Sequence, residues 1–222
     1  MSFTLDPNIA NLETVGELLE HLGDIPAHRV LWKPYPGTAT ERDVIAVEGA
    51  LKKRLCELVD GTLIEKAAGF YESRVGGIVT HFIERYVEQH DLGASFGPDA
   101  PWRILPRRVR MPDFSFVSWE KMPNRELSPE SITSLIPDLV GEVVNIDNSR
   151  REMEWKRRDY FQGGVRLAWE INPRTQSAGV YTSPDQFQEI DLNGSLDGGD
   201  VLPGFTLSLR RLFDRAGRQH GA

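Results

Sequence analysis

The clearest element in the hydrophobic pattern is a strand-helix-strand unit over residues 137–173. Residues 137–145 contain a short run rich in valine and leucine, residues 147–161 are charged with apolar positions at helical spacing, and residues 163–173 are again apolar and end at Asn172-Pro173. A unit of this length joins two parallel strands through a right-handed crossover. The pattern therefore predicts an α/β protein.

Two charged residues fall on faces of this unit that should be buried. Strand alternation places Glu142 in one row with Val140 and Val144, and helical spacing places Lys156 on one stripe with Tyr160. Buried charges are rare unless they are paired or bind a metal. Glu142 and Lys156 are therefore the first candidate site residues. Alternatively, Lys156 lays its methylenes along the sheet and lifts its ammonium into water, and Glu142 lies near the strand end.

The rest of the pattern predicts a helical N-terminal extension over residues 1–53, a core domain over 54–215 and a tail over 216–222. The expected elements are helices at 11–22, 40–54 and 70–89, a hairpin at 55–66, strands at 102–105, 109–117, 178–182 and 186–191, and a final helix near 207–213.

Composition narrows the class of protein. The 222 residues are 40% hydrophobic and 27% charged, enough for one domain with a good core. No apolar run approaches the ~20 residues that span a bilayer, and the N-terminus does not resemble a signal peptide, so we expect a soluble, cytoplasmic protein without a membrane partner. Cys56 is the only cysteine and we expect a core thiol. The net charge of −7 argues against nonspecific coating of nucleic acid, although a local basic surface is compatible with it.

Further acids accompany the first pair. Glu72 continues the apolar stripe of the 70–89 helix at its N-terminal end, where a carboxylate also favours the helix dipole by ~0.3–1 kcal/mol. Asp113 follows Pro112 on the strand after a basic turn. The arginines near that turn are the best candidates for phosphate contacts, or else they form a solvated hairpin tip; they are Arg103, Arg107, Arg108 and Arg110.

Together these residues suggest one chemistry. Two carboxylates on strands, Asp113 and Glu142, with Lys156 nearby suit magnesium-assisted hydrolysis of a phosphodiester. The carboxylates would hold a hard cation that keeps several waters, and the lysine would steady the attacking water or the developing charge.

In these residues the chain resembles the Uma-two family of restriction endonucleases, a branch of the PD-(D/E)XK nuclease superfamily. The resemblance runs from about residue 54 to 212. Its motifs are Glu57-Leu58-Val59-Asp60-Gly61, Gly69-Phe70-Tyr71-Glu72-Ser73, Met111-Pro112-Asp113, Pro137-Asp138-Leu139-Val140-Gly141-Glu142-Val143, Lys156-Arg157-Arg158-Asp159-Tyr160-Phe161, Gly164-Val165-Arg166-Leu167 and Asp200-Val201-Leu202-Pro203-Gly204-Phe205.

The resemblance implies a restriction endonuclease-like mixed sheet flanked by helices, with Asp113 and Glu142 as ligands of Mg²⁺ or Mn²⁺. It implies that Glu72 is the helix acid that holds a metal-bound water. In the superfamily the lysine follows the acid by two positions, but Val144 stands there, and the family resemblance places the lysine on the helix as Lys156.

Asp138 also follows a proline, but it stands ~13 Å along the strand from Glu142, too far to share an ion. Arg157, beside Lys156 and expected on the outward side of the helix, joins Arg103, Arg107 and Arg108 as a predicted DNA contact. The family implies DNA as partner and a homodimer, because cutting both strands usually needs two sites. The alternative is an inactive protein of the same fold that binds nucleic acid or protein.

Overall fold

The computed structural model describes residues 6–217, so most of the predicted tail over 216–222 lies outside the described residues. Within this part of the chain, no helix is long and apolar enough to cross a membrane. The helices are α1 (Val15–His21), α2 (Glu41–Glu48), α3 (Phe70–His90), α4 (Arg150–Gly163) and α5 (Leu209–Ala216), with 3-10 turns η1 (Ala27–Arg29), η2 (Trp119–Lys121) and η3 (Pro123–Arg125). The strands are β1 (Cys56–Val59), β2 (Thr62–Glu65), β3 (Gly93–Phe96), β4 (Trp102–Leu105), β5 (Arg108–Arg110), β6 (Phe114–Ser118), β7 (Leu139–Val143), β8 (Leu167–Asn172), β9 (Ser177–Tyr181), β10 (Phe187–Ile190), β11 (Ser195–Asp197) and β12 (Thr206–Ser208).

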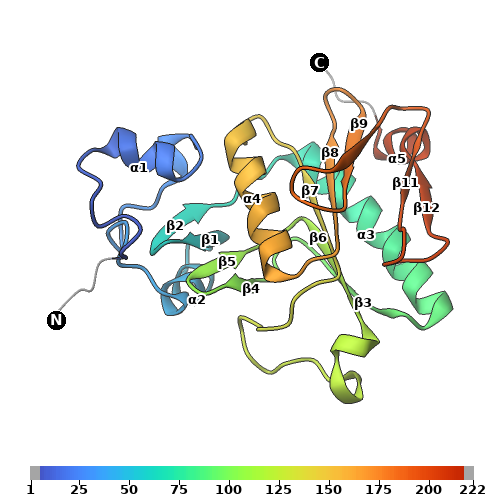
Figure 1. The fold of residues 1–222 in the computed structure, drawn as a ribbon, viewed down its shortest axis with the longest axis horizontal. Coiled ribbons are helices and arrows are strands. Elements are labelled where there is room, and N and C mark those ends of the chain that lie inside the picture. The colour runs from blue at the N-terminus through green and yellow to red at the C-terminus, as the bar shows by residue number, and fades with distance from the viewer. Residues whose placement is uncertain (1–5, 218–222) are drawn as a thin grey trace.

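The central element is a six-stranded mixed sheet in the order β10-β9-β8-β7-β6-β3. β7 and β8 are parallel and are joined through α4, whereas the other neighbouring strands are antiparallel. The predicted strand-helix-strand unit is therefore confirmed, and the fold is the α/β class expected from the sequence (Figure 1).

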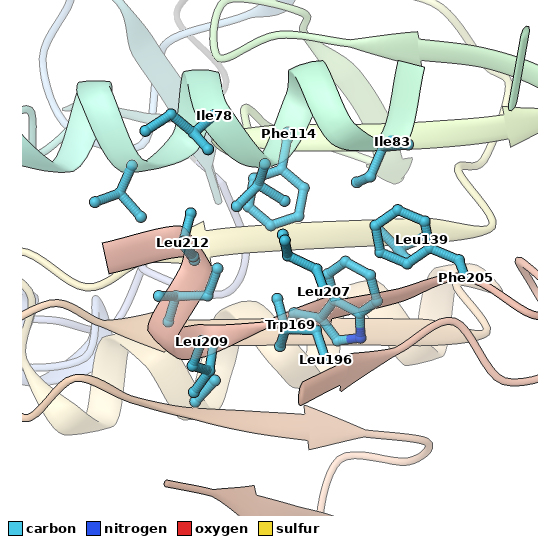
Figure 2. Packing of buried hydrophobic residues seen from close by; sticks show 14 of the residues in the cluster. Ile78, Ile83, Phe114, Leu139, Trp169, Leu196, Phe205, Leu207, Leu209 and Leu212 are labelled. Atoms are coloured by element: carbon cyan, nitrogen blue, oxygen red, sulfur yellow. The ribbon is translucent and has the colours of Figure 1, made fainter. Parts of the chain in front are cut away.

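One face of this sheet is covered by α3, α5 and the β11-β12 hairpin, and this side holds the largest hydrophobic cluster. Figure 2 shows side chains of α3 and of the C-terminal segment on either side of Phe114, Leu139 and Trp169. Phe114 of β6 is the register partner of Gly141 on β7, and its ring lies over the glycine, so that a Cβ at Gly141 would lie 1.9 Å from the ring. Only glycine fits this position without moving the ring.

The opposite face is covered by α4, whose buried side chains include Met153, Lys156 and Tyr160. The predicted helix stripe is therefore buried as expected. Because side chains alternate along a strand, Leu139 and Val143 join the α3 cluster while Val140 joins the α4 cluster. This alternation is what directs the side chain of Glu142 toward α4.

A second sheet of four strands, in the order β2-β1-β5-β4, lies beside the first. The strand predicted over 109–117 is wrong as a single element: the chain leaves β5 in the second sheet and enters β6 in the first, with a break at residues 111–113. Pro112 has no N–H for a ladder bond, so the run of β residues divides there. The division places Asp113 at the junction of the two sheets.

The β1-β2 hairpin is present as predicted and closes through Asp60-Gly61, both of which have positive φ (46° and 71°) as a tight turn requires. The N-terminal helices pack on this hairpin, where Leu18, Leu22 and Ile25 share a core with Val59 and other residues. Cys56 is a buried free thiol, as expected. The division of the chain at residues 53/54 stays a prediction.

Candidate active site

Glu142 projects from β7 into a buried contact with α4. Glu142 is 6% exposed and Lys156 is 2% exposed. The ammonium of Lys156 donates to the two carboxylate oxygens of Glu142 at 3.1 and 3.2 Å. The hydroxyl of Tyr160 donates to the same carboxylate at 2.5 Å. The structure thus brings the predicted pair together, and the alternative in which Lys156 lifts its ammonium into water is wrong.

Lys156 also contacts a second acid, Glu57 of β1, at 3.1 Å. Glu57 is 1% exposed and accepts from Arg110 at 2.8 Å and from the backbone N–H of Met111 at 3.1 Å. Arg110 in turn donates to Asp159 of α4 at 2.6 Å. These residues, from Glu142 through Lys156, Glu57 and Arg110 to Asp159, form a buried ionic network that ties both sheets to α4.

The two acids that share Lys156 have opposite pKa shifts. Burial raises the pKa of Glu142 to about 7, and the negative charges of Asp113 and Glu57 add to burial against the attraction of Lys156. For Glu57, burial acts in the same upward direction, but the attraction of Lys156 and Arg110 outweighs it and lowers the pKa to about 2. Lys156 therefore mainly neutralises Glu57, and Glu142 titrates close to neutral pH.

Asp113 lies at the junction of the sheets, next to β7. Its Oδ2 accepts the backbone N–H of Val143 at 2.6 Å, and its Oδ1 lies 2.8 Å from the ammonium of Lys66. Its side chain is 18% exposed, so it stands between the buried network and the surface. Asp138 lies at the other end of β7, where it accepts the backbone N–H of Ser118 at 2.8 Å and pairs with Lys121 at 2.9 Å.

A cavity of about 250 Å³ opens beside Asp113. Glu72, in the first turn of α3, lines it together with Lys66, and its carboxylate folds over the N-cap residue Gly69, where a Cβ would lie 1.9 Å from Oε2. The structure therefore brings Glu72 and Asp113 to one cavity. The position of Glu72 suits both the helix dipole and a role in the cavity, so the sequence alternatives for it remain.

The carboxylates near the cavity supply some of the oxygen ligands that a hard divalent cation needs. Among residues 6–217, no three His, Cys, Asp or Glu side chains form a ready group of metal ligands. Asp113 and Glu72 line the cavity, whereas Glu142 lies outside its lining; Asp113 accepts the backbone N–H of Val143, the residue that follows Glu142. Mg²⁺ usually takes one or two carboxylates and keeps its other waters, so two acids are sufficient.

The predicted phosphate-binding arginines all have carboxylate partners within the chain. Arg103 pairs with Glu41 at 2.6 Å, Arg108 with Asp60 at 2.7 Å, and Arg107 with Asp6. Their role toward DNA stays a prediction. The solvated-tip alternative holds best for Arg107, whose side chain is 46% exposed.

The expectation that Arg157 faces outward is wrong. Its side chain is 13% exposed, its guanidinium pairs with Glu170 of β8 at 2.7 Å, and it lies over the ring of Tyr181. Arg158, its neighbour on α4, is the exposed arginine, at 62%. The helix register turns Arg157 toward the sheet because β8 and β9 extend beside α4.

Sequence reasoning missed Glu57, Asp159 and Lys66 as parts of the site, and it named Arg110 as a candidate phosphate contact, whereas Arg110 is 3% exposed and pairs with Glu57 and Asp159. Glu57 belongs to the first strand of the hairpin, β1, and strand alternation puts it on one face with Val59, which was a signal that it is buried. Lys66 follows the second strand, β2, and had no such signal. No pattern in the sequence tells which distant charge each one meets.

The comparisons agree with this architecture. A crystal structure of a putative nuclease of the DUF820 group from Anabaena variabilis matches with a TM-score of 0.65 and 19% identity, over 73% of this chain and 92% of that chain. The protein therefore has the restriction endonuclease-like α/β fold of this nuclease. No curated protein matches the sequence. A model of the Uma2 family, described as "Putative restriction endonuclease", matches residues 50–210, so the chain belongs to the Uma2 family.

The raised pKa of Glu142 predicts a pH dependence. Between its ordinary value of 4.5 and about 7, the folded protein holds a proton that the unfolded chain has lost, so this carboxyl stabilises the metal-free fold at low pH and the contribution is lost as pH rises through 7. A cation needs the ionised form. We expect the melting temperature gained with Mg²⁺ to grow between pH 6 and 8, as thermal denaturation with and without Mg²⁺ would measure. An equal gain at both pH values would contradict the assignment.

Proposed function

We propose that this protein is a divalent-metal-dependent endonuclease that hydrolyses DNA phosphodiester bonds. The observation that carries the proposal is the arrangement around the 250 Å³ cavity: Asp113 and Glu72 line it, and Asp113 accepts the backbone N–H of Val143, the residue that follows the buried Glu142 on β7. Membership of the Uma2 family supports a nuclease. Carboxylates beside a cavity that also carries a lysine match the chemistry of metal-assisted phosphodiester hydrolysis.

In this mechanism Asp113 and Glu142 would hold Mg²⁺ or Mn²⁺, and the ion would supply Lewis-acid chemistry, lowering the pKa of a water and stabilising developing negative charge. Glu72 lies across the same cavity and orients the attacking water. Lys156 sits between Glu142 and Glu57 and offsets their charge, so it acts on the site through Glu142. Hydrolysis joins the water oxygen to phosphorus and breaks one P–O ester bond, and the departing oxygen takes up a proton.

The decisive experiment incubates the purified protein with single- and double-stranded DNA and RNA in Mg²⁺, Mn²⁺ or chelator. We expect DNA to be cleaved with either metal and to stay intact in chelator. Asp113→Asn keeps the size of the side chain while removing its negative charge, and it should lower the rate by ~10²–10³. Asp147→Asn, at a half-exposed acid of the loop before α4, is the matched control and should cleave like the parent.

A second function is favoured by one observation. Lys66 pairs with Asp113 at 2.8 Å, so this carboxylate has a counter-ion without any metal, which suits an inactive binding module. In that case DNA or a protein partner would bind equally well with and without metal, and every nucleic acid in the panel would remain intact.

The proposal includes a homodimer, because a cut through both strands of a duplex usually needs two sites related by symmetry. Light scattering coupled to gel filtration, with and without a DNA duplex, measures the assembly. A monomer in both conditions, together with double-strand cleavage, would reject this part of the proposal.

A further inference from the structure

The cavity contains an ammonium group that the mechanism above does not use. Lys66 follows β2, and its side chain is 5% exposed. The ammonium contacts Asp113 Oδ1 at 2.8 Å and donates to the backbone oxygen of Pro98 at 3.0 Å. A lysine this buried needs a compensating charge, and Asp113 provides it.

Lys156 and Lys66 occupy different places relative to the cavity. Lys156 is held between Glu142 and Glu57 and is not among the residues that line the cavity, whereas Lys66 is one of its walls. An anion that enters the cavity therefore meets the ammonium of Lys66 and not that of Lys156.

The cavity has room for such an anion beside Lys66. On the α3 side its wall is formed by Glu72, Ser73, Gly76 and Gly77, and a Cβ added at Gly77 would meet no atom within 4 Å. The charged groups that line the cavity are Lys66, Asp113 and Glu72. Lys66 is the one cationic side chain in that lining, so it is the group there that can attract a phosphate.

We propose that Lys66 has two positions in the reaction cycle. In the metal-free protein it neutralises Asp113. When a divalent cation takes Oδ1 of Asp113, the ammonium is displaced and contacts a non-bridging oxygen of the DNA phosphodiester. This proposal rests on the proposed function and adds the residue that binds the reacting phosphate.

The displacement follows from geometry and charge. Mg²⁺ binds carboxylate oxygens at about 2.0–2.1 Å, and a like charge 2.8 Å from the same oxygen opposes it strongly. Lysine carries a flexible stem of four methylenes, so its ammonium can move without a change in the backbone. The hydrogen bond to the Pro98 oxygen is lost in that movement, and the new contact with a charged phosphate oxygen offsets its cost.

The test compares Lys66→Met with Lys53→Met, an exposed lysine that pairs with Glu48 and does not line the cavity. Calorimetry measures Mg²⁺ binding without DNA, and then binding of inorganic phosphate to the Mg²⁺-loaded protein. We expect Lys66→Met to bind Mg²⁺ about tenfold more tightly and phosphate about tenfold more weakly. Its DNA cleavage should fall by ~10²–10³. Lys53→Met should match the parent in all three.

A second variant, Lys66→Arg, keeps the proposal testable if Lys66→Met does not fold. It keeps the charge, but its guanidinium can hold Asp113 through two hydrogen bonds, so Mg²⁺ binding should become weaker than in the parent, opposite to Lys66→Met. Unchanged Mg²⁺ affinity in both variants, or phosphate binding and cleavage by Lys66→Met at parental levels, would overturn the proposal.

The two proposals fail in different ways. If the parent cleaves no nucleic acid, the proposed function fails, and the Mg²⁺ and phosphate titrations still decide the role of Lys66. If the parent cleaves DNA and Lys66→Met cleaves it equally well, the function stands and the role of Lys66 does not.

Discussion

Lys156→Met is expected to destabilise the metal-free protein by about 3–5 kcal/mol, the cost of leaving buried charges without their partner. The ammonium of Lys156 lies 3.1 Å from both Glu57 and Glu142, and each of the three residues is at most 6% exposed. Methionine keeps the volume of the stem and the helix propensity, so the loss reports the charge. Urea denaturation measures the free energy of unfolding.

Arg158→Met is the matched control on the same helix. Its guanidinium is 62% exposed and stands 3.8 Å from Asp185, so its free energy of unfolding should stay within about 0.5 kcal/mol of the parent. Lys156→Met combined with Glu142→Gln should recover part of the loss, because one of the two unpaired acids is then neutral. Parental stability of Lys156→Met alone would show that its ammonium reaches water.

The second large effect is expected for Glu142→Gln. The rate of its metal-dependent cleavage should fall by a factor of at least ~10²–10³, and the variant should lose the stabilisation that Mg²⁺ gives the parent. At pH 8 its metal-free melting temperature should rise. Burial, with Asp113 and Glu57 nearby, raises the pKa of Glu142 to about 7, so the ionised form costs stability above that pH. Glutamine can still accept the hydrogen bond from Tyr160 through its oxygen.

Glu170→Gln makes a direct comparison, since Glu170 is the register partner of Glu142 on β8. Glu170 pairs with Arg157 and lines a different cavity together with Arg157 and Tyr181, so this variant should keep its response to Mg²⁺. A Glu142→Gln protein that melts lower without metal and is still stabilised by Mg²⁺ would identify Glu142 as a structural acid.

The sequence by itself determined the elements whose signals are local. Two apolar runs on either side of a charged helical stripe predicted the β7-α4-β8 unit, and period-two alternation predicted the face of Glu142. Spacing along α4 likewise predicted that Lys156 is buried. These predictions hold because secondary-structure period and burial are properties of neighbouring residues.

Only the tertiary structure decided which charges meet. Glu57 and Lys156 are far apart in the chain and come together because β1 and α4 pack at the junction of two sheets, and Lys66 finds Asp113 in the same way. The division between β5 and β6 and the inward position of Arg157 also depend on neighbouring strands rather than on local pattern. Charge pairing acts through space over a few ångströms, so no periodicity along the chain encodes it.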